Sequence, residues 1–133
     1  MRSLLSFLST GVTLAAFLGC DGPTKPANPV CESSTAIVIG PSSPHAIGWS
    51  PTCRVAGIAV EDAINGATNW MVYTPRGEIT FVGPATIGTL PAGLNELIAS
   101  SALTSGRLYR IRLLGEWQYG HFLDLASKAF TEP

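Results

Sequence analysis

The sequence predicts an all-β fold, a single antiparallel β-sandwich of about seven strands, and three observations lead to this class. Short runs of β-branched and aromatic residues are separated by clusters of Gly, Pro, Asn and Ser. Residues 108–114 alternate apolar and polar side chains with the period of two that a half-buried strand needs. No helical period competes between residues 31 and 82. Many short strands joined by turns are typical of a sandwich.

The strands follow from this pattern in order along the chain. Asn65-Gly66 predicts a hairpin turn, because both residues tolerate positive φ. Residues 83–97 hold two prolines and three glycines, which predicts a crossing loop with at most a short strand, and residues 116–121 are expected to form a second loop. The expected strands cover residues 36–39, 46–50, 54–60, 69–74, 78–82, 108–114 and 122–131.

A short apolar segment that ends at a cysteine precedes this domain. Arg2 gives a positive start, and the uncharged residues 4–18 are too few to span a bilayer, which takes roughly 20 residues in a helix. The Gly19-Cys20 junction resembles the bacterial lipobox, in which a signal peptidase cuts before a cysteine that carries lipid. The resemblance implies that residues 1–19 are removed and that Cys20 anchors the protein to a membrane. An ordinary signal peptide or an uncleaved anchor is the alternative.

Residues 20–30 are expected to form a short tether, and residues 31–133 a single domain. The tether holds three prolines and almost no apolar side chain, so it cannot pack. Its nine residues 21–29 span roughly 30 Å when extended, which keeps the domain close to the bilayer. The expected location is the cell envelope, facing the periplasm or the exterior. Asp21 directly after Cys20 resembles the inner-membrane retention signal of some Gram-negative bacteria.

Charge and composition restrict the partners. Removal of Arg2 lowers the Lys and Arg count from 8 to 7 against 9 Asp and Glu, with no run of either sign. Nucleic acid is therefore not an expected partner, because phosphate binding needs clustered basic residues. Charged residues make up 13% of the chain, about half of the usual share of roughly 25%. This shortage favours a surface that is either sticky or covered by a partner.

The cysteines agree with export. With Cys20 bound to lipid, Cys31 and Cys53 are the remaining pair, and an oxidising compartment would join them in a disulfide. Two free buried thiols are the alternative. A metal site is not expected, because the chain has no CxxC pair and both His45 and His121 stand alone. No cofactor is expected either.

Two short motifs resemble the fibronectin type III family, and Ig-like domains fit nearly as well. These motifs are Ile47-x-Trp49-x-Pro51 and Leu103-x-x-Gly106-x-x-Tyr109-x-Ile111-x-Leu113, and the resemblance covers residues 31–133. It implies that Tyr109 is the corner tyrosine, with a buried ring and a hydroxyl bonded to backbone near residues 103–106. It also implies a binding or spacer module without catalytic residues to carry over.

Motifs for catalysis are missing from the sequence. There is no Gly-x-Ser-x-Gly elbow and no phosphate loop, and neither histidine has a carboxylate at a suggestive spacing. Glu61-Asp62 is half of a calcium pattern, but a solvated turn is the favoured interpretation of an acidic pair that opens an Asn-Gly turn. The protein is therefore not expected to be an enzyme.

One cluster has binding character: Trp117, Tyr119 and His121. Aromatic faces beside hydrogen-bonding edges suit sugars or protein hot spots. The favoured structural interpretation is that Trp117 and Tyr119 cap the end of the sandwich core. Together these features predict a membrane-anchored envelope lipoprotein that acts as a non-enzymatic interaction or accessory module with a protein partner. A carbohydrate-binding module using Trp117 and Tyr119, or a small hydrolase or inhibitor, is the alternative.

Overall fold

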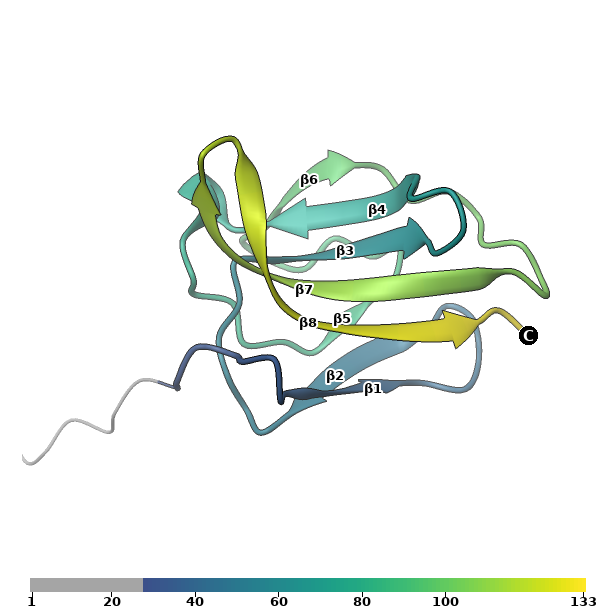
Figure 1. Cartoon of the computed structure of the whole chain (residues 1–133), viewed down its shortest axis with the longest axis horizontal. Helices are drawn as coiled ribbons and strands as arrows, with labels where there is room; N and C mark the ends of the chain where they lie inside the picture. Colours follow the sequence, from purple (N-terminus) through teal and green to yellow (C-terminus); the bar gives the residue numbers. More distant parts are fainter. Residues whose placement is uncertain (1–27) are drawn as a thin grey trace, which may run out of the picture.

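The computed structural model describes residues 28–133 as two antiparallel sheets packed face to face (Figure 1). The predicted all-β sandwich is confirmed, with eight strands in place of about seven. One sheet has the order β1-β2-β5 and the other the order β6-β4-β3-β7-β8. The strands are β1 (Ala36–Ile39), β2 (Ala46–Ser50), β3 (Gly57–Asp62), β4 (Thr68–Tyr73), β5 (Ala85–Thr86), β6 (Asn95–Ile98), β7 (Leu108–Gln118) and β8 (His121–Thr131). The cut and lipid anchor predicted at Gly19 and Cys20 lie outside the described residues.

The segment between β4 and β5 differs from the prediction. The strand expected at residues 78–82 is wrong, because the chain forms the 3-10 turn η1 (Pro75–Gly77) and afterwards pairs only at Phe81, in an isolated bridge to Val55. Arg76 and Gly77 both have positive φ, which turns the backbone out of the sheet. The expected crossing loop contains β5 and β6, and β6 adds an edge strand to the larger sheet.

The last hairpin is also tighter than expected. The loop predicted at residues 116–121 is wrong: β7 continues to Gln118 and β8 begins at His121, so only Tyr119 and Gly120 form the turn. Both have positive φ, 51° and 85°, as a two-residue hairpin turn whose twist matches its strands requires. β7 and β8 are therefore the longest strands.

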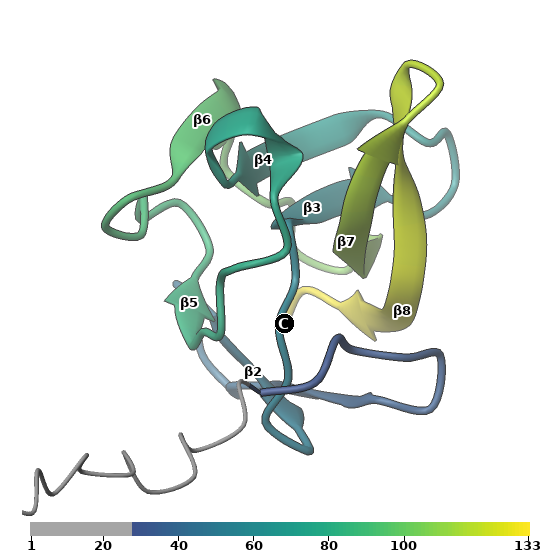
Figure 2. The ribbon, with the colours of Figure 1, turned by 90° about the vertical axis from the view of Figure 1, so that its left-hand side faces the viewer.

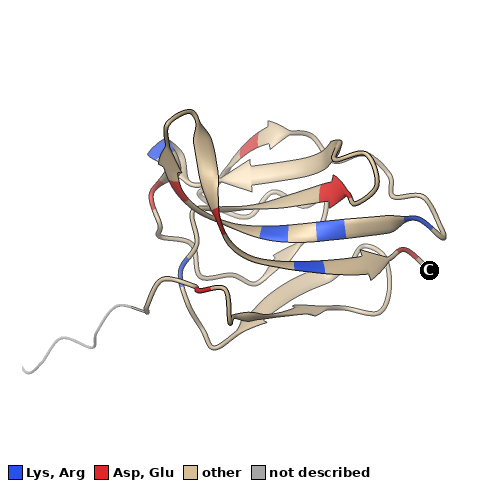
Figure 3. Cartoon of the chain, viewed as in Figure 1, with Lys and Arg blue, Asp and Glu red and all other residues tan. Residues whose placement is uncertain are grey.

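The main core lies between the sheets. Ile37 and Ile47 from the smaller sheet meet Ile58, Val60 and Ile111 from the larger one. Alternation along each strand produces this pattern, because every second side chain points to the same face. The strands of the smaller sheet carry no charged side chain (Figure 3).

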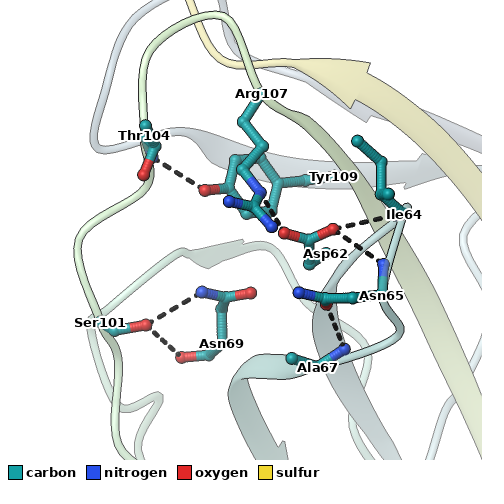
Figure 4. A network of polar contacts seen from close by, with 9 residues as sticks. All are labelled: Asp62, Ile64, Asn65, Ala67, Asn69, Ser101, Thr104, Arg107 and Tyr109. Carbon is teal, nitrogen blue, oxygen red and sulfur yellow. Dashed lines mark hydrogen bonds and ion pairs between the residues drawn. The ribbon is translucent and has the colours of Figure 1, made fainter.

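Tyr109 is the corner tyrosine that the sequence predicted. Its ring is 2% exposed, and its hydroxyl accepts a hydrogen bond from the Thr104 backbone N–H at 2.8 Å (Figure 4). The bond holds the loop before β7 against the strand that leaves it. The prediction of a buried ring with a backbone partner near residues 103–106 is confirmed.

The start of the described chain is fixed to the domain at two points. Cys31 and Cys53 form the predicted disulfide. Arg54 holds the preceding residues: its backbone N–H donates to the Pro29 carbonyl at 2.7 Å, its side-chain Nε donates to the Asn28 carbonyl, and it pairs with Val30. The last residues of the expected tether therefore leave the domain from a defined place.

Candidate binding surface on the outer face of the five-stranded sheet

The five-stranded sheet carries a second apolar cluster on the face turned away from the main core. Ala59 and Leu114 follow the inward-facing Ile58 and Leu113, so they point outward, and both are buried. This outer cluster contains Ala56, Ala59, Leu114 and Phe122, with Met71, Tyr73 and Ile79 packed against it. An antiparallel sheet with a solvated outer face would have polar residues there. The outer face of this sheet is therefore suited to contact something other than water.

The tip of the β7–β8 hairpin, which rises above β3 in Figure 2, supplies the aromatic wall of this face. Trp117 meets Phe122 edge to face, with ring centroids 4.8 Å apart, and Phe122 meets Tyr73 at 5.9 Å. The close approach of the hairpin tip to η1 depends on Gly77, because a Cβ at this position would lie 2.9 Å from the Trp117 Cβ. The hairpin and η1 thus hold the three rings in one group.

Two hollows share this wall. The apolar hollow, of about 290 Å³, is lined by Tyr73, Arg76, Gly77, Leu97, Trp117 and Phe122. The polar hollow, of about 450 Å³, includes Glu61, Arg112, Asp124, His121, Trp117 and Phe122 in its lining. Trp117 is 48% exposed although it lines both. A half-exposed indole between an apolar and a polar hollow can contact a ligand in either.

Arg112 organises the charge of the polar hollow. Its Nε donates to Asp124 Oδ1 at 2.7 Å, and its Nη1 donates to Glu61. Burial lowers the pKa of Arg112, but the two carboxylates outweigh this effect and raise the pKa above its ordinary value. With two carboxylates and one guanidinium, the hollow has a net charge of one negative at neutral pH. It therefore favours neutral ligands with hydrogen-bond donors over anions.

The predicted binding residues are only partly brought together. Trp117 and His121 line the polar hollow, while Tyr119 at the turn is 96% exposed and lines neither hollow. The interpretation that both Trp117 and Tyr119 cap the sandwich core is wrong for Tyr119, whose ring is exposed; Trp117 packs on the buried Phe122 of the outer cluster and not on the main core. The pairs Trp117–Phe122 and Gln118–His121 extend the hairpin beyond the expected strand ends and place Tyr119 in its turn. Phe122 is the buried aromatic residue near the tip of this hairpin.

Sequence reasoning missed Tyr73, Phe122 and the Arg112 cluster. A signal was present in residues 69–74, where Met71 and Tyr73 alternate with the inward Trp70 and Val72. A strand that is apolar on both faces packs on both faces. The ionic contacts of Arg112 join residues 51 and 12 positions away and had no local signal.

The favoured interpretation of the acidic pair at residues 61 and 62 as a solvated turn is wrong: both residues end β3, and Asp62 is buried and holds the turn that follows (Figure 4). Asp62 Oδ1 accepts hydrogen bonds from the backbone N–H groups of Ile64 and Asn65, at 2.9 and 3.2 Å, and Oδ2 pairs with Arg107. Burial raises the pKa of Asp62, but the backbone bonds and Arg107 outweigh burial and hold the pKa below its ordinary value. Between residues 28 and 133 no three His, Cys, Asp or Glu side chains gather as a metal site.

Comparison of the chain with protein-family models, curated proteins and solved structures gives no match. In the part of the chain that the structure describes, no helix has the length and apolar character needed to cross a membrane.

Proposed function

We propose that the protein is a lipid-anchored, non-enzymatic interaction module of the cell envelope that binds a protein partner through the outer face of its five-stranded sheet. The observation that carries the proposal is the half-exposed Trp117, held by Phe122 and Gly77 between the two hollows. Fixed aromatic rings lose little conformational entropy on binding, and Trp, Tyr and Arg are the residues that dominate interface energies. Tyr73 and Arg76 lie in the same hollow as Trp117.

The chemistry of the surface supports a protein partner. An interface typically has an apolar centre and a polar rim. Here the apolar hollow would take the partner's anchoring side chain, and the cluster of Glu61, Arg112 and Asp124 would form part of the rim. Leu97 on the edge strand β6 is 56% exposed and extends the apolar area.

The anchor is supported by the sequence before the domain. Gly19-Cys20 follows a short apolar segment, and a proline-rich stretch separates Cys20 from the first described residue, Asn28. Residues 28–30 are held against the domain by Arg54. An anchor at Cys20 would therefore hold the binding surface close to the bilayer.

A capture experiment tests this function. Wild-type protein is used to capture partners from detergent-solubilised membranes, beside Trp117→Ala and the control Leu90→Ala, whose side chain is 48% exposed but lines neither hollow. Loss of a central interface Trp costs about 2 kcal/mol or more, or roughly 30-fold in affinity. We expect a stoichiometric partner with the wild type and the control, and its loss with Trp117→Ala. Equal capture by all three proteins would contradict the proposal.

A carbohydrate ligand is the second candidate, and the polar hollow favours it. Trp117 offers a ring face, and carboxylate oxygens of Glu61 and Asp124 can accept hydrogen bonds from hydroxyl groups. Tyr119 lines neither hollow, so the candidate residues become Trp117 and His121. Titration with neutral oligosaccharides tests it. Binding that His121→Ala weakens, and that Tyr119→Ala leaves unchanged, would favour the carbohydrate over the protein partner.

A further inference from the structure

One end of the domain combines the exit of the tether with exposed aromatic side chains. The start of the described chain, dark blue, and the tip of the β7–β8 hairpin lie on the left in Figure 1, and the C-terminus lies on the right. A shallow hollow of about 530 Å³ joins these parts, because Val30, Arg54, Arg76 and Trp117 all line it. The end of the tether, at Val30, and the exposed indole therefore border the same hollow.

The hairpin tip has the composition of a membrane-interface segment. Residues 117–122 contain two exposed aromatic rings and no Asp, Glu, Lys or Arg. Tyr119 is 96% exposed at a positive φ of 51°, a conformation that suits Asn or Gly better than an aromatic residue. Its hydroxyl has no hydrogen-bond partner among residues 28–133. The fold itself thus gives no use for this ring.

We infer that this end of the domain rests on the bilayer that holds Cys20, with the rings of Trp117 and Tyr119 at the level of the lipid headgroups. Trp and Tyr prefer this level because each has an apolar body and a polar edge. The inference depends on the lipid anchor proposed above. It adds a second contact between the protein and the membrane and defines which way the domain faces.

The length of the chain before Asn28 supports this orientation. Cys20 and Asn28 are eight residues apart, so the connection spans at most roughly 28 Å. The 11 residues of β7 run along the domain, a length of roughly 35 Å. The connection is shorter than the domain, so the end that carries Pro133 cannot face the bilayer. The end with the hairpin tip can.

The charges at this end set the expected lipid dependence. Arg54 and Arg76 are balanced by Glu78 and Glu116 around the same hollow. Binding should therefore depend on the aromatic rings and not on anionic lipid. With the tip on the bilayer, the two hollows of the outer face lie beside the membrane surface, where they would meet a membrane-bound partner.

Tryptophan fluorescence can test the orientation, because the three tryptophans differ in exposure. Trp70 is fully buried, Trp49 is partly buried with its Nε1 bonded to the Cys53 carbonyl, and Trp117 is 48% exposed. The full, lipidated protein is reconstituted in phosphatidylcholine vesicles with or without bromine on the upper acyl chain. We expect the brominated lipid to reduce the emission of the wild type and not that of Trp117→Phe. Tyr119→Ser should make this reduction in emission smaller, and the matched control Leu90→Ser should leave it unchanged.

The outcomes separate this inference from the anchor. Mass spectrometry of the same sample reports whether Cys20 carries lipid. If Cys20 carries none, both the anchor and the orientation fail. If Cys20 is lipidated but brominated and ordinary vesicles give equal emission, the orientation alone is wrong. Quenching that appears only after phosphatidylglycerol is added would also overturn it, because electrostatic adsorption would then explain the contact.

Discussion

His45 and Glu132, 87 residues apart in the sequence, are joined by a buried hydrogen bond of 2.8 Å between Nε2 and Oε2. The other ring nitrogen, Nδ1, lies 2.6 Å from the Gly40 carbonyl. Both ring nitrogens of the buried His45 therefore have an oxygen partner. This contact ties the loop between β1 and β2 to the end of β8, and so joins the two sheets.

Removal of the carboxylate should therefore destabilise the domain. Glu132→Ala leaves Nε2 of the buried His45 without a partner, which typically costs about 1 to 3 kcal/mol. Glu116→Ala is the matched control, because Glu116 is exposed and bonds only to the neighbouring Gln118. Urea unfolding measures both. Equal stability of the two variants would show that the contact with His45 is not needed.

The corner tyrosine gives a graded prediction. Tyr109→Phe removes only the hydrogen bond from the Thr104 backbone N–H. Because Thr104 is exposed, we expect the free energy of unfolding to fall by only about 0.5 to 1.5 kcal/mol. Tyr109→Ala also empties part of the core and should cost roughly 3 to 5 kcal/mol. Chemical denaturation of the two variants checks the order. A Tyr109→Ala protein as stable as the wild type would contradict the role of this ring in the core.

The disulfide should contribute stability mainly by restricting the unfolded chain. Cys31 and Cys53 are 22 residues apart, and a loop of this length is worth roughly 3 kcal/mol in the chain-entropy model. In urea denaturation, the double variant Cys31→Ser, Cys53→Ser should have a free energy of unfolding lower than that of the wild type by about this amount. Addition of a reductant should destabilise the wild type and leave the double variant unchanged. If the reductant affects both equally, the effect does not come from this bridge.

Two glycines with similar backbone angles test the packing of the hairpin on η1. Gly66 and Gly77 have φ of 73° and 69°, but a Cβ at Gly66 would have nothing within 4 Å, while one at Gly77 would meet Trp117. Gly66→Ala should cost about 1 to 2 kcal/mol through its backbone alone. Gly77→Ala should cost roughly 1 to 3 kcal/mol more through overpacking.

Trp117 fluorescence gives a second measurement on the same pair of variants. Gly77→Ala should shift the emission of Trp117, because it displaces the ring, and Gly66→Ala should not. An unchanged spectrum in Gly77→Ala would mean that the hairpin tip does not rest on η1.

The lowered pKa of Asp62 predicts how stability depends on pH. A carboxylate whose pKa is lower in the folded protein stabilises it at pH above the unfolded value, about 3.9. That stability is lost as the pH falls through the folded pKa. Asp62→Asn keeps an oxygen for the Ile64 and Asn65 N–H groups and loses the charge facing Arg107. As the pH falls from 7 to below 4, the free energy of unfolding should therefore decrease less steeply in Asp62→Asn than in the wild type.

The parts of the fold that the sequence predicted rest on local chemistry. Residues 36–39 and 108–114 follow simple strand patterns, and the disulfide follows from a single remaining cysteine pair. The short strands β5 and β6 could not be predicted, because Gly and Pro dominate residues 83–97 and the pairing partners lie elsewhere in the chain. Residues 78–82 are the opposite case, because a strand was predicted there and does not form. There Pro75, Arg76 and Gly77 turn the chain away from a partner strand.

The candidate site was predicted less completely than the fold. Trp117 and His121 stand out in the sequence because aromatic and imidazole groups are few in this chain. Their separation from Tyr119 depends on a turn of only two residues, which composition alone could not reveal. The hollows also need Tyr73 from β4, Leu97 from β6 and Arg112 from the distant part of β7, and such neighbours are not visible in one sequence.

Site-specific photo-cross-linking in the living cell tests the central claim, binding of a protein partner at the outer face, most directly. A photoreactive residue replaces Leu97, which lines the apolar hollow, or Leu90, which is similarly exposed outside both hollows. The account predicts one discrete protein adduct from position 97, its loss when Trp117→Ala is added, and no adduct from position 90. The same adducts from both positions, or an adduct at position 97 that Trp117→Ala leaves unchanged, would contradict it.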